Sequence, residues 1–325
     1  MSQRVYSILT LVLMLAAAAL FVRAGFLWVS RANGGGDARG VNAGAVPQEV
    51  SARTGGAGAS GETSEEPDGL PDGAAKPQEK VRVPVLMYHQ FSEKPERFSQ
   101  WCMSASELRA DLAYLRANGY TAILPSELLA GLRGERALPE KPVMLTFDDG
   151  HETMLAVVLP LLEEFDMKAV ANVVGSYCDL YSEQEDHTLD YSSLTWDEVG
   201  ELYASGRVEI GSHSYDLHDN TGRKGIRILP GEDAASYREM LARDTLACQR
   251  RIEDATGVRP TVYAYPFGYY CDEAVELLSE LGYTVLLGCQ GRVNTVSADG
   301  ELPLCLERFN RPHGVATETF MKKLG

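Results

Sequence analysis

The chain has 325 residues, of which 45% are hydrophobic, and its formal net charge at pH 7 is −16. This length suits one large domain or two small ones. The acidic excess argues against nucleic acid as a partner, because phosphate binding needs a basic patch. It also argues against an anionic substrate that is held by charge alone.

Residues 1–30 are predicted to be a membrane anchor. The run from Val5 to Val22 carries no charge, and Arg23 ends it. About 18 to 20 apolar residues suffice to span a bilayer, whereas a cleaved signal peptide has a shorter apolar core and a small-residue cleavage site. The surroundings of Arg23 make a poor cleavage site, so we favour an uncleaved signal anchor over a cleaved signal peptide. Either reading predicts an exported protein, anchored on a bacterial membrane with its folded part outside, or secreted if the segment is cleaved.

Residues 31–80 are predicted to be a flexible linker. They are rich in Gly, Ala, Ser, Pro and Glu and contain no aromatic residue. Such a segment cannot bury enough apolar surface to offset the entropy lost on ordering.

Residues 81–325 have the pattern of one folded domain in which strands and helices alternate. The segments expected to be strands are 81–89, 121–125, 142–147, 168–174, 207–213, 261–268, 283–289 and 304–310. The segments expected to be helices are 104–120, 125–132, 154–165, 195–206, 232–256, 271–282 and 317–324. The first of these helices is capped by Ser104 or Ser106. Repeated strand–helix units predict a parallel α/β architecture, either a barrel or an open sheet.

Polar residues collect where the predicted strands end. Asp148 and Asp149 end one strand, His213 ends another, Pro266–Gly268 ends a third and His89 a fourth. Because sites in parallel α/β folds lie at the carboxyl ends of the strands, these residues are the candidates for a functional site.

Two histidines and an aspartate in this set suit a metal ion. His213 and His218 are five residues apart, a spacing at which their rings converge only if His213 closes a strand and His218 returns from a loop. Two imidazoles and one carboxylate suit zinc, with cobalt, nickel or iron as alternatives. Packing or surface histidines are an equally weighted reading.

The adjacent aspartates need an explanation, because neighbouring strand residues point to opposite faces. At the end of the strand, Gly150 lets the backbone turn. Two bare carboxylates repel each other, but with a metal present one aspartate can be a ligand and the other a base. A solvated Asp-Asp-Gly turn is the alternative.

Three motifs resemble the NodB-type polysaccharide deacetylases, carbohydrate esterase family four. They are TFDDG at Thr146–Gly150, His213-Ser214, and YPFG at Tyr265–Gly268, and the resemblance spans about residues 82–315. The VPVLMYHQF stretch and the five-residue histidine step resemble the branch that contains the poly-N-acetylglucosamine deacetylases. The resemblance implies a distorted (β/α) barrel of about seven strands. It also implies a metal-dependent N-deacetylase that acts on N-acetylglucosamine units of a cell-surface or matrix polysaccharide.

The resemblance also implies roles for single residues. Asp148 resembles the general base, and Asp149, His213 and His218 resemble the metal ligands. The backbone N–H of Phe267 resembles the group that stabilises the oxyanion.

Two features depart from the family pattern. Ala264 stands where the family has an arginine that orients the base, and Arg259, Arg308 and Arg311 are the possible substitutes. The late motif that supplies the general acid is not plainly present, and His313 is the candidate for that role, with an ordinary loop histidine as the alternative.

Other functions remain open from the sequence. They are a catalytically impaired barrel that binds glycan, an O-acetyl esterase on the same scaffold, and a phosphatase, which the scarcity of basic residues near the aspartates disfavours. The six cysteines show no metal-ligand spacing, and their positions suggest small buried residues in place of a disulfide framework.

Overall fold

The computed structural model describes residues 80–184, 186–219 and 221–325. The predicted anchor and the predicted linker up to residue 79 lie outside the described residues. Within the described part of the chain, no helix is both long enough and apolar enough to cross a membrane. All six cysteines fall in this part and are unpaired.

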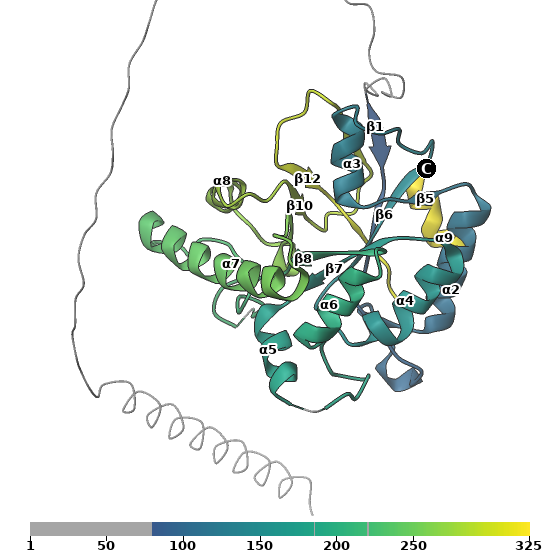
Figure 1. The fold of residues 1–325 in the computed structure, drawn as a ribbon, viewed down its shortest axis with the longest axis horizontal. Coiled ribbons are helices and arrows are strands. Elements are labelled where there is room, and N and C mark those ends of the chain that lie inside the picture. The colour runs from purple at the N-terminus through teal and green to yellow at the C-terminus, as the bar shows by residue number, and fades with distance from the viewer. Residues whose placement is uncertain (1–79, 185, 220) are drawn as a thin grey trace, which may run out of the picture. The chain divides into compact units, whose positions relative to one another are not determined.

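The core of the domain is a parallel sheet that curls into a half-barrel (Figure 1). In spatial order its strands are β12 (Leu304–Leu306), β10 (Val285–Leu287), β9 (Val262–Ala264), β8 (Val208–Ser212), β7 (Ala169–Val173), β6 (Pro142–Phe147), β2 (Val85–Tyr88) and β13 (Phe309–Asn310), with β5 (Thr121–Ala122) beside β6. The predicted α/β class is confirmed. The sheet has nine strands where about seven were expected, because short strands such as β5 and β13 extend it.

The two edge strands of the sheet are close together in the sequence. The edge strands are β12 and β13, and only Glu307 and Arg308 separate them. The prediction of one continuous strand over 304–310 is therefore wrong, because its two halves pair with β10 and β2 at opposite edges. Three Cα–Cα steps span at most about 11 Å, so the edges are no farther apart than that. Arg308 lies at this crossing.

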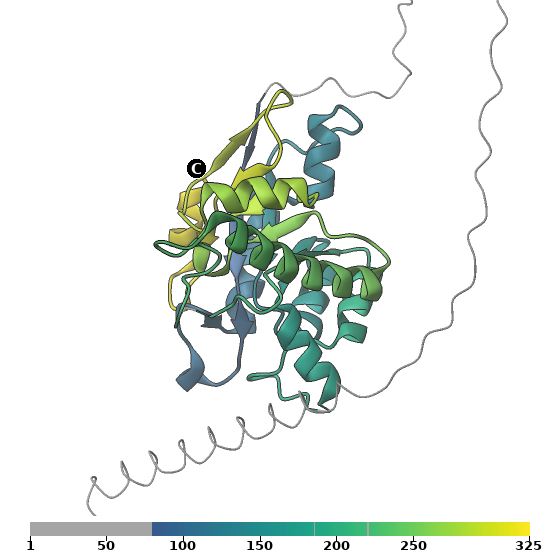
Figure 2. The same cartoon turned by 90° about the vertical axis from the view of Figure 1, so that its left-hand side faces the viewer.

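Helices cover the outside of the half-barrel, as Figures 1 and 2 show. They are α2 (Ala105–Ala117), α3 (Pro125–Leu132), α4 (Leu159–Phe165), α5 (Gly175–Glu183), α6 (Trp196–Ala204), α7 (Ala234–Thr256), α8 (Asp272–Glu280) and α9 (Thr317–Met321). Of the two predicted caps of α2, Ser104 is the one used: its side chain accepts from Glu107 N–H, and the Glu107 carboxylate accepts from Ser104 N–H. The sequence did not predict α5, in which only Gly175 and Cys178 are buried.

Proline and short pairings account for the remaining departures from the predicted elements. The predicted strand 81–89 is interrupted at Pro84, which has no N–H to donate. The part before it, β1 (Val81–Val83), pairs antiparallel with β11 (Asn294–Val296) instead of joining the main sheet. Strands β3 (Gln90–Phe91) and β4 (Cys102–Met103) form a separate parallel pair. A π-helical turn at Met154–Val158 leads into α4.

The sheet is buried on both faces, as the apolar strands predict for a parallel sheet. In β6, Val143, Leu145 and Phe147 belong to the larger apolar cluster, with buried residues of α2, α4 and α6. Met144 belongs to a different cluster, with residues of the neighbouring strands. This alternation decides which side chains face the inside of the half-barrel.

Candidate active site

A buried polar cluster lies just beyond the ends of β6 and β12, at positions that continue the inward-facing side of these strands. Met144, Thr146 and Asp148 follow one another at two-residue intervals, so their side chains fall on the same face. The same holds for Leu304, Leu306 and Arg308. The Arg308 guanidinium donates from Nη1 to Asp148 Oδ1 (2.7 Å) and to Thr146 Oγ1 (3.1 Å). Its Nε donates to the carbonyl of Gly288 (2.9 Å). Of the three arginines considered as substitutes for an arginine at position 264, Arg308 is the one that contacts Asp148.

Asn172 of β7 gives Asp148 a second hydrogen bond. Asn172 Nδ2 donates to Asp148 Oδ1 at 2.8 Å. The neighbouring position in β8 is Gly211, where an added Cβ would lie 2.2 Å from Asn172 Oδ1. A glycine is therefore needed in β8 for Asn172 to reach Asp148.

These contacts determine the charge of Asp148, whose side chain is only 2% exposed. Burial by itself would raise its pKa. The charge of Arg308, the charge of His213 and the Arg308 hydrogen bond outweigh burial and lower the pKa to about 2. Asp148 is therefore ionised at neutral pH, and both hydrogen bonds hold Oδ1. Its Oδ2 lies 4.0 Å from His213 Nε2.

Asp149 leaves the strand pattern and faces two histidines. Its φ is 72°, and that of Gly150 is 66°, so the turn involves both residues and not the glycine alone. Asp149 Oδ1 lies 3.2 Å from His218 Nε2 and 3.5 Å from His213 Nε2. This oxygen is buried, and no donor among the described residues meets it with hydrogen-bond geometry.

His213 is oriented as a metal ligand would be, and His218 faces the same carboxylate oxygen. His213 Nδ1 lies 2.8 Å from the carbonyl of Ala264, so Nδ1 carries the proton and Nε2 presents a lone pair. Burial lowers the pKa of His213 to about 4, which keeps the ring neutral at pH 7. Burial acts in the same direction on His218, but the contact with Asp149 prevails and raises its pKa.

The spacing of these three groups fits a tetrahedral zinc ion. Bonds of about 2.0–2.1 Å in a tetrahedron place neighbouring ligand atoms about 3.3 Å apart. The separations of 3.2 and 3.5 Å from Asp149 to the histidines agree with this value, and the ligand atoms of all three residues lie within 4.8 Å of one another. The predicted set of Asp149, His213 and His218 is thus brought together by the fold.

Unusual backbone angles concentrate at this site. Four non-glycine residues in the described ranges have positive φ, and three of them, Asp149, Ser214 and Phe267, belong to the loops around the histidines. Such angles cost about 1–3 kcal/mol each and persist where the surrounding structure holds them. The ring of Phe267 stacks on that of His218 at 4.6 Å between centroids.

The segment that carries His218 is held by α7. The backbone N–H groups of Tyr215 and Asp216 donate to the two carboxylate oxygens of Asp244, at 2.9 and 2.8 Å. Burial raises the pKa of Asp244 to about 6 although both N–H donors oppose the shift.

A pocket of about 340 Å³ opens over these groups. Its lining consists of Met87, His89, Trp101, Asp148, Asp149, His213, His218, Tyr265, Phe267, Gly268, Cys289 and Arg308. Trp101 is half-exposed, and its ring and that of His89 are in an edge-to-face arrangement with their centroids 4.7 Å apart. Burial lowers the pKa of His89 although Asp149 and Asp148 oppose the shift.

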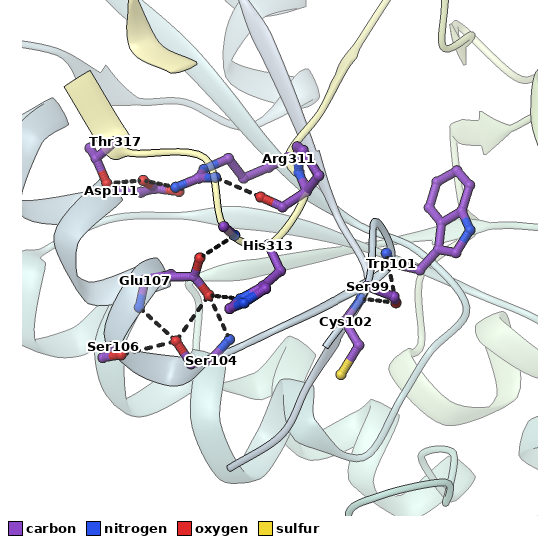
Figure 3. A network of polar contacts seen from close by, with 12 residues as sticks. Ser99, Trp101, Cys102, Ser104, Ser106, Glu107, Asp111, Arg311, His313 and Thr317 are labelled. Carbon is purple, nitrogen blue, oxygen red and sulfur yellow. Dashed lines mark hydrogen bonds and ion pairs between the residues drawn. The ribbon is translucent and has the colours of Figure 1, made fainter. Parts of the chain in front are cut away.

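His313 is not brought into this pocket. Its Nδ1 lies 2.8 Å from Glu107 Oε2 of α2, and Figure 3 shows the ring directed at that carboxylate. Its other face stacks on Phe98, at 4.2 Å between centroids. In the same region Arg311 forms a buried pair with Asp111. Neither His313 nor Arg311 touches Asp148.

Comparisons with known proteins identify relatives of this chain. The sequence profile described as polysaccharide deacetylase matches residues 135–286. A poly-beta-1,6-N-acetyl-D-glucosamine N-deacetylase of Escherichia coli (strain K12) is 30% identical over 241 residues, which is 68% of this chain. The chain belongs to the polysaccharide deacetylase family. The chain spans 36% of the length of the E. coli protein.

Solved structures share the fold of the deacetylase domain. A de-N-acetylase from Aggregatibacter actinomycetemcomitans is 26% identical, with a TM-score of 0.63, and the match covers 75% of this chain and 100% of that one. IcaB from Ammonifex degensii is 25% identical, with a TM-score of 0.60, and the match covers 75% of this chain and 95% of that one.

The sequence did not predict the contribution of Asn172 to this site, and it left the roles of His89 and Arg308 open. Asn172 lies inside an apolar strand. The only indication of its role in the sequence is that its side chain points to the same face as that of Val170, two residues earlier. His89 was noticed at a strand end but received no role. Arg308 was one of three arginines that the sequence could not rank.

Proposed function

We propose that this protein is a metal-dependent N-deacetylase that removes acetate from N-acetylglucosamine units of a polysaccharide. The observation that carries the proposal is the convergence of Asp149, His213 and His218 beside the ionised Asp148–Arg308 pair in one pocket. A ligand set next to a free carboxylate suits hydrolysis, because hydrolysis needs both an electrophilic centre and a proton acceptor.

The pocket residues divide the chemistry of amide hydrolysis among them. A divalent ion held by Asp149, His213 and His218, with zinc favoured over cobalt, nickel or iron, would polarise the acetyl carbonyl and lower the pKa of a water molecule. Asp148 takes the proton of the attacking water on Oδ2, because Arg308 and Asn172 occupy Oδ1. The backbone N–H of Phe267 is the proposed donor to the oxyanion.

The leaving amine needs a proton, and we assign its delivery to the protonated form of His89 in place of His313. Because burial lowers the pKa of His89, this form is the minor one in the free protein. His89 lines the pocket, whereas His313 is hydrogen-bonded to Glu107 elsewhere. The Nδ1 atom of His89 is buried and has no hydrogen-bond partner among the described residues.

The proposed substrate is a polymer of N-acetylglucosamine on the cell surface or in its matrix. The likeness to the E. coli poly-beta-1,6-N-acetyl-D-glucosamine N-deacetylase supports this class. The exposed faces of Trp101 and Phe267 at the pocket also support it, because aromatic rings supply apolar surface for the C–H faces of a sugar.

The deciding experiment measures acetate release from defined oligomers. β-1,6-linked and β-1,4-linked N-acetylglucosamine oligomers are compared with an O-acetylated sugar, before and after removal of metal by a chelator. We expect release from an N-acetylated oligomer, loss of release on chelation and recovery on addition of zinc. Release from the O-acetyl sugar alone would establish an esterase, and binding without release would establish a glycan-binding barrel.

We also propose that residues 1–30 anchor the chain in a membrane and that residues 31–80 tether an extracellular catalytic domain. The uncharged run from Val5 to Val22 and the aromatic-free composition of the linker support this organisation. Limited proteolysis should cut between about residues 31 and 80 and release an active domain. Loss of activity on clean removal of the linker would contradict its role as a spacer.

A further inference from the structure

A second group of metal-binding side chains lies beside the active-site turn. Glu152 follows the Asp148–Gly150 turn, and segment 186–198 is bound to this stretch through the backbone. Glu152 N–H donates to the carbonyl of Ser192 (2.9 Å), and the N–H of Leu194 donates to the carbonyl of Gly150 (2.8 Å). Segment 186–198 brings His187 and Glu198 to Glu152, and each of the three offers one ligand atom within 4.8 Å of the others.

The separations in this group match those of a metal ligand set. His187 Nδ1 lies 3.0 Å from Glu152 Oε1 and 3.7 Å from Glu198 Oε1. These values bracket the spacing of about 3.3 Å that a tetrahedral zinc ion imposes on neighbouring ligand atoms. They resemble the separations of 3.2 and 3.5 Å in the Asp149 set.

The carboxylates of this group lack a sufficient counter-charge. Glu152 is 7% exposed, and its Oε2 is buried without a hydrogen-bond partner in the part of the chain that the structure describes. Glu198 uses Oε2 to accept from the N–H and hydroxyl of Thr195 at the start of α6, which leaves Oε1 toward His187. Within the described ranges, His187 is the one basic side chain paired with either carboxylate. One imidazole can balance the charge of only one of the two carboxylates, so an added cation would complete the neutralisation of the group.

We propose that Glu152, His187 and Glu198 form a second divalent-metal site, of the class that binds zinc or manganese. An imidazole with two carboxylates suits these ions, whereas calcium prefers oxygen ligands alone. The ion would cross-link segment 186–198 to the turn that carries Asp148 and Asp149. His187 has a side chain 57% exposed, which leaves the site open to ions from solvent.

The test is the number of zinc ions bound per chain, measured by equilibrium dialysis of the full-length protein and elemental analysis. We expect two ions for the wild type and one for His187→Gln, for Glu152→Gln and for His213→Ala. His313→Gln is the matched control, because His313 contacts a single carboxylate, Glu107, at 2.8 Å. This control should leave the count at two, and circular dichroism checks that each variant is folded.

The outcomes separate this site from the proposed catalytic metal. If the wild type binds one ion that His213→Ala removes and His187→Gln does not, the second site is refuted and the group is a protonated histidine between two carboxylates. If the one ion is removed by His187→Gln and not by His213→Ala, the second site stands and the catalytic metal fails. Equal loss in the His313→Gln control would identify adventitious surface binding and overturn the proposal.

Discussion

Arg308 is the residue whose replacement tests the active-site geometry most directly. Arg308→Met removes three hydrogen bonds and leaves Asp148 with the single bond from Asn172. Both partners of the ion pair are almost fully buried, at 1% and 2% exposure. Breaking such a pair costs about 3–5 kcal/mol, because the remaining carboxylate is buried without its counter-ion.

The chain supplies a matched control in Arg311→Met. Arg311 is equally buried and holds Asp111 through two bonds of 2.7 and 3.1 Å, so its loss should destabilise the fold by a similar amount. Arg311 makes no contact with Asp148. The two variants therefore separate the stability of the domain from the orientation of the base.

The assay combines urea unfolding with acetate release per folded molecule. Both variants should lose about 3–5 kcal/mol of unfolding free energy. Only Arg308→Met should also lose turnover, by about 10²-fold, which is the effect of misplacing a catalytic group by about 1 Å. An equal loss of turnover per folded molecule in both variants would refute the assignment of Arg308 as the positioning residue for Asp148.

Three further predictions follow from the site. Asp148→Asn should keep its metal and lose turnover by about 10²–10⁴-fold, whereas Asp149→Asn should lose metal affinity and regain part of its activity in excess zinc; equal rescue of both would contradict these roles. His89→Gln should lower turnover with metal retained while His313→Gln stays near wild type, and the opposite ranking would return the acid role to His313. Folded wild type keeps Asp244 protonated between about pH 4 and 6, where the unfolded chain ionises it, so stability should fall as pH rises through this window, by at most about 3 kcal/mol. Asp244→Asn should lack this decline, which urea unfolding of both proteins at pH 4 and pH 7 measures. A difference in unfolding free energy between the two proteins that does not change with pH would contradict the prediction.

The sequence alone determined the class of fold and the chemical character of the site. Apolar strands that alternate with helices predicted a parallel sheet, because period and composition are local properties of the chain. The placement of Asp148, Asp149 and His213 at strand ends predicted their convergence, because carboxyl ends of parallel strands share one edge. The five-residue step between His213 and His218 also predicts that His218 returns from a loop, since this spacing leaves few other ways for the two rings to meet.

Tertiary structure alone decided how Asp148 is held and which histidine reaches the pocket. Arg308 contacts Asp148 because Glu307 and Arg308 cross between opposite edges of the curled sheet, and that crossing depends on pairings with β10 and β2. His313 also comes shortly after a strand, β13, but its ring is hydrogen-bonded to Glu107. A local pattern indicates where a side chain stands on its own element. The partner that it meets across 160 or 206 residues depends on how the sheet closes, and no local signal encodes that.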